Sequence, residues 1–278
     1  MKKKLFVTLT GTILTASLLI GCSASGSAPK KISAAHKSKT ADSQQTFTVG
    51  FDAEYPPYGY LDDNGEYTGF DLELAEAVCK LEGWELVKKP INWDSKDMEL
   101  DSGSIDCIWN GFTMNGREDD YTFSIPYVDN SQVIVVSEVS GITSLEDLSG
   151  KVVGVQAASA ALSLLQSEEA GGQKALADTF RSLNEFADYN TAFTELQAGA
   201  LDALAIDIGV ANYQMKSRGE GFKILDESLN TEQYAIGFKK GNQELCDIVN
   251  ADLEQLTEDG TVAALAEKYD ITDMVTLK

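Results

Sequence analysis

The sequence predicts an α/β fold built on mostly parallel sheets. Short apolar segments alternate along the chain with amphipathic segments at helical spacing, and this alternation is typical of βαβ units. Polar residues follow several of the apolar segments directly. In a parallel sheet such positions gather at the edge where binding sites form. The length of 278 residues suffices for one large domain or two small ones.

The composition excludes some classes of function. Hydrophobic residues make up 43% of the chain and aromatic residues 9%, which is ample for a packed core. The formal net charge is -22, and no basic stripe that could meet phosphates remains beyond the N-terminal leader. Because nucleic-acid binding depends on such a stripe, we expect no nucleic-acid partner. Acidity of this kind mainly keeps a protein soluble.

The N-terminus predicts export and lipidation. Residues 1–21 carry three lysines directly after Met1 and continue as an interrupted apolar stretch, which is the layout of a signal peptide. The stretch ends in LLIGC, which resembles the lipobox at which a cysteine is lipidated and becomes the first residue of the mature protein. We therefore predict a lipid, such as palmitate, on Cys22. A plain secreted protein and a single-span membrane anchor are the alternatives, and the short apolar core disfavours the anchor.

Residues 22–45 are small, polar and basic, and they predict a flexible tether because they bury too little to offset ordering entropy. The only histidine, His36, lies in this segment. A histidine-based triad or a histidine-rich metal site is therefore excluded from the folded part, and we expect neither metal nor cofactor. Cys79, Cys107 and Cys246 lack metal-site spacing, so we expect buried thiols, with a Cys79–Cys107 disulfide as the alternative.

The first predicted strand, residues 47–51, leads into a loop rich in acidic and aromatic side chains. The adjacent prolines 56–57 cannot continue a sheet and predict an exposed, stiff loop. Its rings could form the wall of a pocket, although Tyr58 could equally pack beneath the loop. This loop presents Asp52, Glu54, Tyr55 and Tyr58.

The next elements continue the alternation. A turn at 64–65 precedes an amphipathic helix over 69–83, which Gly83 closes. Trp93 stands among polar residues, which favours a pocket lid over a core position. Further predicted elements are a strand at 84–90, a helix at 98–103 and a strand from 105 to 109.

Residues 105–127 predict the main binding loop. A short apolar strand turns polar at Asn110, and Gly111 allows close approach of the backbone to a ligand. Thr113 offers a hydroxyl, and the Arg117 guanidinium can grip a carboxylate through two parallel hydrogen bonds. The alternative for Arg117 is a solvated ion pair with one of the acidic residues 118–120.

The second half of the chain repeats the alternation and adds two candidate site residues. Ser159 stands near the start of a predicted helix, where it could bind an anion, cap the helix, or do both. Asp207 follows a short apolar strand and could bind an ammonium or cap the next helix. The predicted strands are 131–137, 151–155, 180–186, 201–206 and 231–239; the predicted helical segments are 143–150, 190–199, 242–258 and 261–269.

Two segments, DAEYPPYGY…GFDLELAEAV and NGFTMNGRED, resemble the extracellular solute-binding proteins that deliver polar amino acids to ABC importers. The resemblance implies a two-lobed, periplasmic-binding-protein-like fold of type II with two hinge crossings. Each lobe would be a mostly parallel sheet flanked by helices, with lobe 1 formed by 46–131 and 232–278 and lobe 2 by 132–231. Before Arg117 the loop is one residue shorter than usual, and Ala158 stands where the family usually has glycine.

The resemblance also implies a site and partners. Arg117, Thr113 and Ser159 would hold the α-carboxylate of an amino acid and Asp207 its ammonium, with Gly111 close to the ligand. Partners would be an ABC permease and its ATPase, with a monomeric protein on the outer face of the cell membrane. The side-chain pocket would comprise Asp52, Glu54, Tyr55, Trp93 and Asn110.

The identity of the ligand and the function itself stay open at this point. Asp52 and Glu54 favour a cationic amino acid, whereas Asn110 and the aromatic rings suit glutamine or cystine. One alternative function is an enzyme on the same fold, similar to periplasmic dehydratases, with Glu54 as the acid/base carboxylate. Another is an adhesion or signalling lipoprotein whose cleft has lost its ligand.

Overall fold

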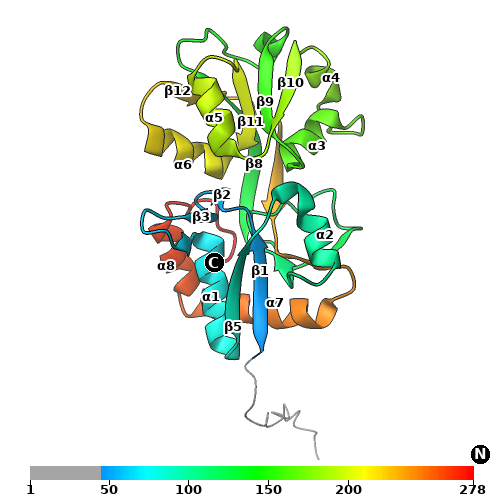
Figure 1. The fold of residues 1–278 in the computed structure, drawn as a ribbon, viewed down its shortest axis with the longest axis vertical. Helices are drawn as coiled ribbons and strands as arrows, with labels where there is room; N and C mark the ends of the chain where they lie inside the picture. Colours follow the sequence, from blue (N-terminus) through cyan, green and yellow to red (C-terminus); the bar gives the residue numbers. More distant parts are fainter. Residues whose placement is uncertain (1–44) are drawn as a thin grey trace, which may run out of the picture. The chain divides into compact units, whose positions relative to one another are not determined.

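A computed structural model of the protein describes residues 45–278 (Figure 1), which fall in one compact unit. The predicted signal peptide, the predicted lipidation site Cys22, His36 and residues 22–44 of the predicted tether lie outside this part. None of the helices described is long and apolar enough to cross a membrane.

Two main sheets divide the described chain into two lobes. The sheet of lobe 1 has the order β5-β1-β6-β14-β7, with β1 parallel to β5 and β6 and with β14 antiparallel to its neighbours. A small antiparallel sheet, β2-β3-β4, adjoins it. The elements of lobe 1 are β1 (Thr46–Phe51), β2 (Glu54–Tyr55), β3 (Gly59–Leu61), β4 (Tyr67–Thr68), α1 (Phe70–Glu82), β5 (Glu85–Pro90), the 3-10 turn η1 (Trp93–Ser95), α2 (Lys96–Asp101), β6 (Cys107–Ile108), β7 (Tyr121–Phe123), β14 (Gly237–Lys239), α7 (Gln243–Glu258) and α8 (Thr261–Lys268).

Side chains along the strands of lobe 1 point alternately to the two faces of the sheet, and helices cover both faces. Phe47, Val49 and Phe51 of β1 point to one face and join the core beneath α1 and α7. Ile108 belongs to a second cluster, on the side of α2. Gly83 ends α1 in the left-handed conformation (φ 68°), as predicted.

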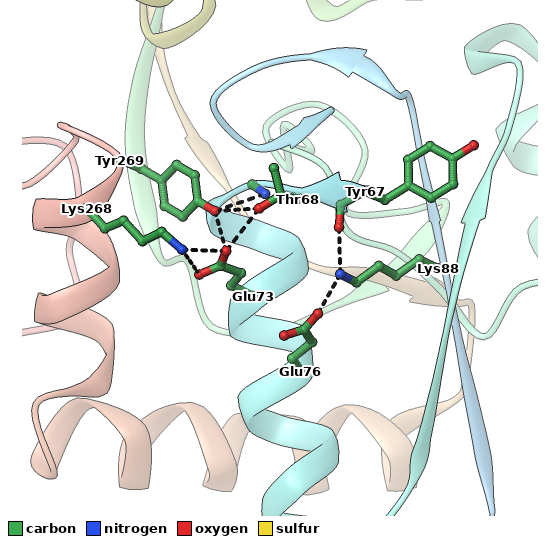
Figure 2. Close-up of polar contacts among 8 residues, drawn as sticks. Tyr67, Thr68, Glu73, Glu76, Lys88, Lys268 and Tyr269 are labelled. Carbon is green, nitrogen blue, oxygen red and sulfur yellow. Dashed lines mark hydrogen bonds and ion pairs between the residues drawn. The ribbon is translucent and has the colours of Figure 1, made fainter. Parts of the chain in front are cut away.

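Polar contacts at the start of α1 tie neighbouring elements to it (Figure 2). Glu73 accepts hydrogen bonds from the Lys268 ammonium (2.6 Å) and the Tyr269 hydroxyl (2.6 Å) at the end of α8. The Thr68 hydroxyl donates to the same carboxylate (2.9 Å). On the other side, Lys88 of β5 contacts Glu76 at 2.5 Å. These contacts hold α8, β4 and β5 against one helix.

The sheet of lobe 2 has the order β10-β9-β11-β8-β12, and β13 pairs with the free length of β8. Strands β9, β10 and β11 are parallel, whereas β8 is antiparallel to β11, β12 and β13. The elements are β8 (Val128–Ser137), the 3-10 turn η2 (Glu146–Leu148), β9 (Val152–Gln156), α3 (Ala160–Gln166), α4 (Lys174–Ala177), β10 (Ser182–Phe186), α5 (Tyr189–Gln197), β11 (Ala203–Asp207), α6 (Ile208–Arg218), β12 (Phe222–Ile224) and β13 (Asn230–Tyr234).

Strand β8 is buried on both faces, which explains its continuous apolar run. Val133 and Val135 face the core that contains residues of α5 and α6. Ile134 and Val136 face a separate core with α3. Helices therefore cover both faces of this sheet.

Strands β8 and β13 also connect the lobes. They pair antiparallel from Val128 opposite Tyr234 to Gln132 opposite Asn230, and β8 continues into the sheet of lobe 2 (Figure 1). The two crossings thus form a paired ribbon rather than two separate linkers.

Two sequence predictions about this part of the chain are wrong. The single strand expected at 231–239 is two strands, because residues 235–236 leave β8; the Ala235 amide instead donates to the Phe112 carbonyl (3.0 Å). The double-proline loop is buried, not exposed: Tyr58 is fully buried, and the Phe70 amide at the start of α1 donates to the Pro57 carbonyl (2.8 Å).

The three cysteines of the described chain are free and buried, so the Cys79–Cys107 disulfide considered as an alternative is not formed. Burial raises the pKa of the Cys107 thiol well above its usual value. These thiols act as small apolar core groups.

Candidate ligand-binding site

A small cavity brings together side chains from both lobes. Its free space is about 10 Å³, which is about the room that one water molecule needs. An amino acid needs far more space, so its entry requires these side chains to move apart. The lining residues are Tyr55, Trp93, Gly111, Thr113, Arg117, Gln156, Ser159, Ala160 and Asp207.

Arg117 keeps its charge available in this cavity. Its Nη1 donates to the Thr113 carbonyl (3.1 Å), and its guanidinium lies 4.8 Å from the centre of the Phe112 ring. Within residues 45–278 Arg117 makes no ion pair, so the alternative pairing with residues 118–120 is not formed. An oriented guanidinium without a carboxylate partner suits an anionic ligand.

Gly111 is required by close packing around the loop. Its φ is 54°, and a Cβ there would lie 2.9 Å from the Tyr55 ring and 3.0 Å from the Tyr234 ring. Its amide donates to the buried Asp71 carboxylate (2.6 Å). Burial raises the pKa of Asp71 to about 7. The Gly111 amide therefore anchors the loop to α1 and is already engaged.

The hydroxyl of Thr113 is not oriented to donate a hydrogen bond to the carboxylate of a ligand. Its hydroxyl donates to Glu232 Oε1 (2.8 Å). A hydroxyl has one hydrogen, so this bond leaves only the lone pairs of Thr113 Oγ1 for a ligand. Those lone pairs can accept from an ammonium.

Ser159 caps α3 and lines the cavity at the same time. Its Oγ accepts from the Leu162 amide (3.1 Å), which leaves the hydroxyl hydrogen for another partner. The preceding Ala158 has a φ of 54°, the left-handed conformation that glycine adopts more readily. Such a conformation costs a residue with a Cβ roughly 1–2 kcal/mol. At this position the family usually has glycine, and Ala158 keeps the backbone conformation that a glycine would adopt.

Asp207 is buried, with an exposed fraction of 3%, at the carboxyl end of β11. It occupies the N-cap position of α6, yet its side chain makes no capping bond. Its Oδ1 accepts instead from Asn130 (2.8 Å), Gln132 (2.6 Å) and the Tyr234 hydroxyl (2.7 Å). In the described residues no lysine or arginine pairs with it, so its charge suits a cationic ligand group.

Three predicted site residues do not line the cavity but lie beside it: Asp52, Glu54 and Asn110. Asp52 is buried and accepts from the Gln156 amide (2.6 Å), and burial raises its pKa to about 6. Asn110 accepts from the Asp52 amide. Glu54 is exposed and accepts from Asn190 of lobe 2. Asp52 and Glu54 thus join the two lobes at the edge of the site.

Comparison with known proteins assigns the family. Residues 47–272 match the sequence-family model of the bacterial extracellular solute-binding proteins, family 3. The chain belongs to this family.

Two curated relatives are amino-acid-binding proteins by name. The L-cystine-binding protein TcyJ of Escherichia coli K12 is 30% identical over 227 residues, covering 81% of this chain and 82% of the relative. The arginine-binding extracellular protein ArtP of Bacillus subtilis 168 is 31% identical over 274 residues, covering 97% and 98%. A solved solute-binding protein of an ABC uptake transporter from Streptococcus pneumoniae, with bound histidine, has a TM-score of 0.79 and 32% identity, covering 83% and 94%.

The two-lobed, periplasmic-binding-protein-like fold was predicted from the sequence, and the family assignment confirms it.

Trp93 lines the cavity in a half-buried position, and its ring meets Phe112 edge to face. The described residues contain no group of three or more His, Cys, Asp or Glu side chains that could hold a metal ion.

Several residues in and around this candidate site were not predicted from the sequence. Gln156 directly ends the apolar strand β9, so the criterion that selected Asp207 could also have selected it. No local pattern identifies the others, because they lie on the crossing strands or on α5 and come close to Asp207 only when the chain folds. These residues are Asn130, Gln132, Tyr189, Glu232 and Tyr234.

Proposed function

We propose that the protein is the extracytoplasmic binding subunit of an ABC importer and binds a polar L-amino acid between its lobes. One observation carries the proposal: Arg117 and Asp207, which are of opposite charge and have no ion-pair partner within residues 45–278, line the same cavity from different lobes. An α-amino acid carries the complementary carboxylate and ammonium at fixed separation. Membership in the solute-binding family supports the same assignment.

The proposed roles follow from the hydrogen bonds that are already made. Arg117 and the hydroxyl of Ser159 hold the α-carboxylate. Asp207 holds the ammonium, and the lone pairs of Thr113 Oγ1 accept from it. The rings of Tyr55 and Trp93 enclose the ligand side chain.

The same proposal includes closure by a hinge. Residues 46–131 and 232–278 would move as lobe 1 and residues 132–231 as lobe 2, bending at the paired strands β8 and β13. Ligand contacts divided between lobes favour the closed form, because a ligand shifts an equilibrium by its differential affinity. A permease can then distinguish loaded from empty protein by shape.

Location and assembly complete the proposal. A lipid on Cys22 would hold a monomeric protein at the outer face of the cell membrane, beside its permease and ATPase partners. The relative ArtP, described as an extracellular protein, aligns over 97% of this chain, which supports export. The segment that carries Cys22 lies outside the described residues.

The decisive experiment is a thermal-shift screen with the twenty common amino acids and L-cystine. A ligand at 100 times its Kd stabilises the folded protein by about 2.7 kcal/mol, so a true ligand gives a clear rise in Tm. We expect a rise with at least one polar amino acid. No rise with any of them contradicts the proposal and favours an adhesion or signalling lipoprotein.

The enzymatic alternative has weaker support. Glu54, the acid/base candidate from the sequence, is exposed, bonded to Asn190 and absent from the cavity lining. General acid/base catalysis requires such a group within reach of the substrate. Incubation of the protein with each stabilising ligand, followed by mass analysis, should return the ligand unchanged.

A further inference from the structure

Glu232 is a buried carboxylate next to the proposed ammonium site. It lies on β13, the returning crossing strand, and its exposed fraction is 4%. Its Oε1 accepts three hydrogen bonds, from Thr113 Oγ1 (2.8 Å), Asn130 Nδ2 (2.7 Å) and Gln132 Nε2 (2.8 Å). Asn230 Nδ2 is 3.3 Å from its Oε2.

The same two amides also donate to Asp207. Asn130 Nδ2 is 2.8 Å and Gln132 Nε2 2.6 Å from Asp207 Oδ1. Each amide nitrogen has two hydrogens, so each can serve both carboxylates. Strand register explains the arrangement: Gln132 is opposite Asp207, and Asn130 is opposite Glu232. One face of the crossing strand β8 therefore joins the two acidic groups.

No cation in the described part of the chain balances this pair of carboxylates. Within the described residues neither takes part in an ion pair. The other titratable groups that face Glu232 or Asp207 are the tyrosine hydroxyls 55, 58, 189 and 234, which are neutral in the physiological range. Arg117 reaches this group only through Thr113: it donates to the Thr113 carbonyl, while the Thr113 hydroxyl donates to Glu232.

We propose that Glu232 is the second carboxylate of the ammonium subsite: it acts through Asn130 and Gln132, and the ligand ammonium beside Asp207 compensates its charge. This inference rests on the proposed function. It makes Glu232 a positioning residue that favours ligands with an α-ammonium. It also links the subsite to the crossing strands, because three of the four residues lie on β8 or β13.

The electrostatics give the proposal a measurable consequence. Burial, followed by the nearby Asp207 charge, raises the pKa of Glu232 above its usual range. An ammonium bound beside Asp207 adds a positive charge and so lowers the pKa of Glu232. At any pH where Glu232 is protonated in the free protein and ionised in the complex, its proton is released to the solvent on binding. Affinity should therefore rise with pH across the window between the pKa values of the free and the bound states.

Calorimetry of the wild type and Glu232→Gln tests this linkage. The glutamine oxygen can accept the same three donors, but the side chain cannot ionise. Titrations with L-arginine, L-histidine and L-cystine from pH 5 to 8, in phosphate and in imidazole, count the protons released per ligand. We expect the variant to release fewer protons per ligand than the wild type. Its affinity should also rise less with pH. For each pH unit by which the ligand lowers the pKa of Glu232, the rise in wild-type affinity should exceed that of the variant about tenfold. Glu185→Gln, an exposed change on β10, should match the wild type.

The possible outcomes separate the inference from the proposed function. Equal proton release by the wild type and Glu232→Gln, with both binding, overturns the inference alone. A wild type that binds neither these probes nor any amino acid of the thermal-shift screen contradicts both. Carbon-13 NMR of the wild-type Glu232 carboxyl does not require the variant to fold. Its titration midpoint should fall when the bound probe is present, and an unchanged midpoint rejects the inference.

Discussion

The side chains of Asp52 and Gln156 join the two lobes through a hydrogen bond of 2.6 Å between Gln156 Nε2 and Asp52 Oδ2. Asp52 follows β1 of lobe 1, and Gln156 ends β9 of lobe 2. Asn190 donates to Glu54 across the same boundary, and Lys216 of α6 pairs with Asp270 beyond α8 at 2.8 Å. The structure thus shows the lobes in contact, around a cavity of about 10 Å³. Ligand exchange then requires these contacts to break.

Closure can be measured directly in solution. If the lobes separate in the empty protein and meet on the ligand, small-angle X-ray scattering should show a smaller radius of gyration with saturating ligand. The ligand for this measurement is the amino acid with the largest thermal shift. Superimposable scattering curves at saturation would rule out the hinge mechanism while leaving binding itself intact.

Arg117→Ala should abolish amino-acid binding while leaving the fold intact. A buried carboxylate that loses its guanidinium partner costs roughly 3–5 kcal/mol, so affinity should fall about 100-fold to 1,000-fold or more. Isothermal titration calorimetry measures this change, and circular dichroism checks the fold. The matched control is Arg181→Ala, whose side chain is 68% exposed; it should bind like the wild type. Wild-type affinity in Arg117→Ala would show that the loop has been assigned wrongly.

Cys22→Ser should release the protein into the medium or leave the leader uncleaved. The expected reason is that the variant lacks the acceptor for the lipid. A single acyl chain binds membranes only marginally, so stable anchoring depends on the several chains of a bacterial lipoprotein. Detergent-phase partitioning and mass spectrometry of the N-terminus report the outcome. Unchanged partitioning of the variant would count against lipidation.

Asp71→Asn should change how stability depends on pH. Burial raises the pKa of Asp71 from 3.8 to about 7, so folding disfavours its charged form. In the wild type, the contribution of Asp71 to the free energy of unfolding is fully present below pH 4 and is lost progressively as the pH rises to about 7. Above that pH the contribution no longer changes. For every pH unit by which folding raises the pKa of this carboxyl, the free energy of unfolding changes by about 1.4 kcal/mol.

Urea unfolding of both proteins at pH 4 to 8 measures this effect. The free energy of unfolding of the wild type, relative to the variant, should decrease over that interval. Asp52, Glu232 and Asp252 also have raised pKa values, but both proteins contain them, so their contributions cancel in the difference. Parallel curves would mean that Asp71 is already ionised in the folded protein at low pH.

The sequence by itself determined the order of the elements, the helix boundary at Gly83 and the polar residues at the strand ends. These features depend on local spacing, because apolar periodicity decides which face of a strand or helix is buried. Ser159 and Asp207 could be selected as candidates for the same reason: each follows a strand or begins a helix, where backbone geometry exposes side chains to a site. Arg117 could be selected as the guanidinium in the loop that follows the strand at 105–109.

Only the tertiary structure decided which polar groups meet. Glu54 bonds to Asn190, 136 residues away, instead of facing the cavity. The hydroxyl of Thr113 is engaged by Glu232, 119 residues further along the chain. The double-proline loop is buried because distant elements pack around it: the ring of Tyr58 meets that of Tyr234, and the Tyr58 hydroxyl lies close to Gly209 of α6. Local sequence cannot specify such pairs, since the side-chain partners of a strand residue are set by strands that become neighbours only when the chain folds.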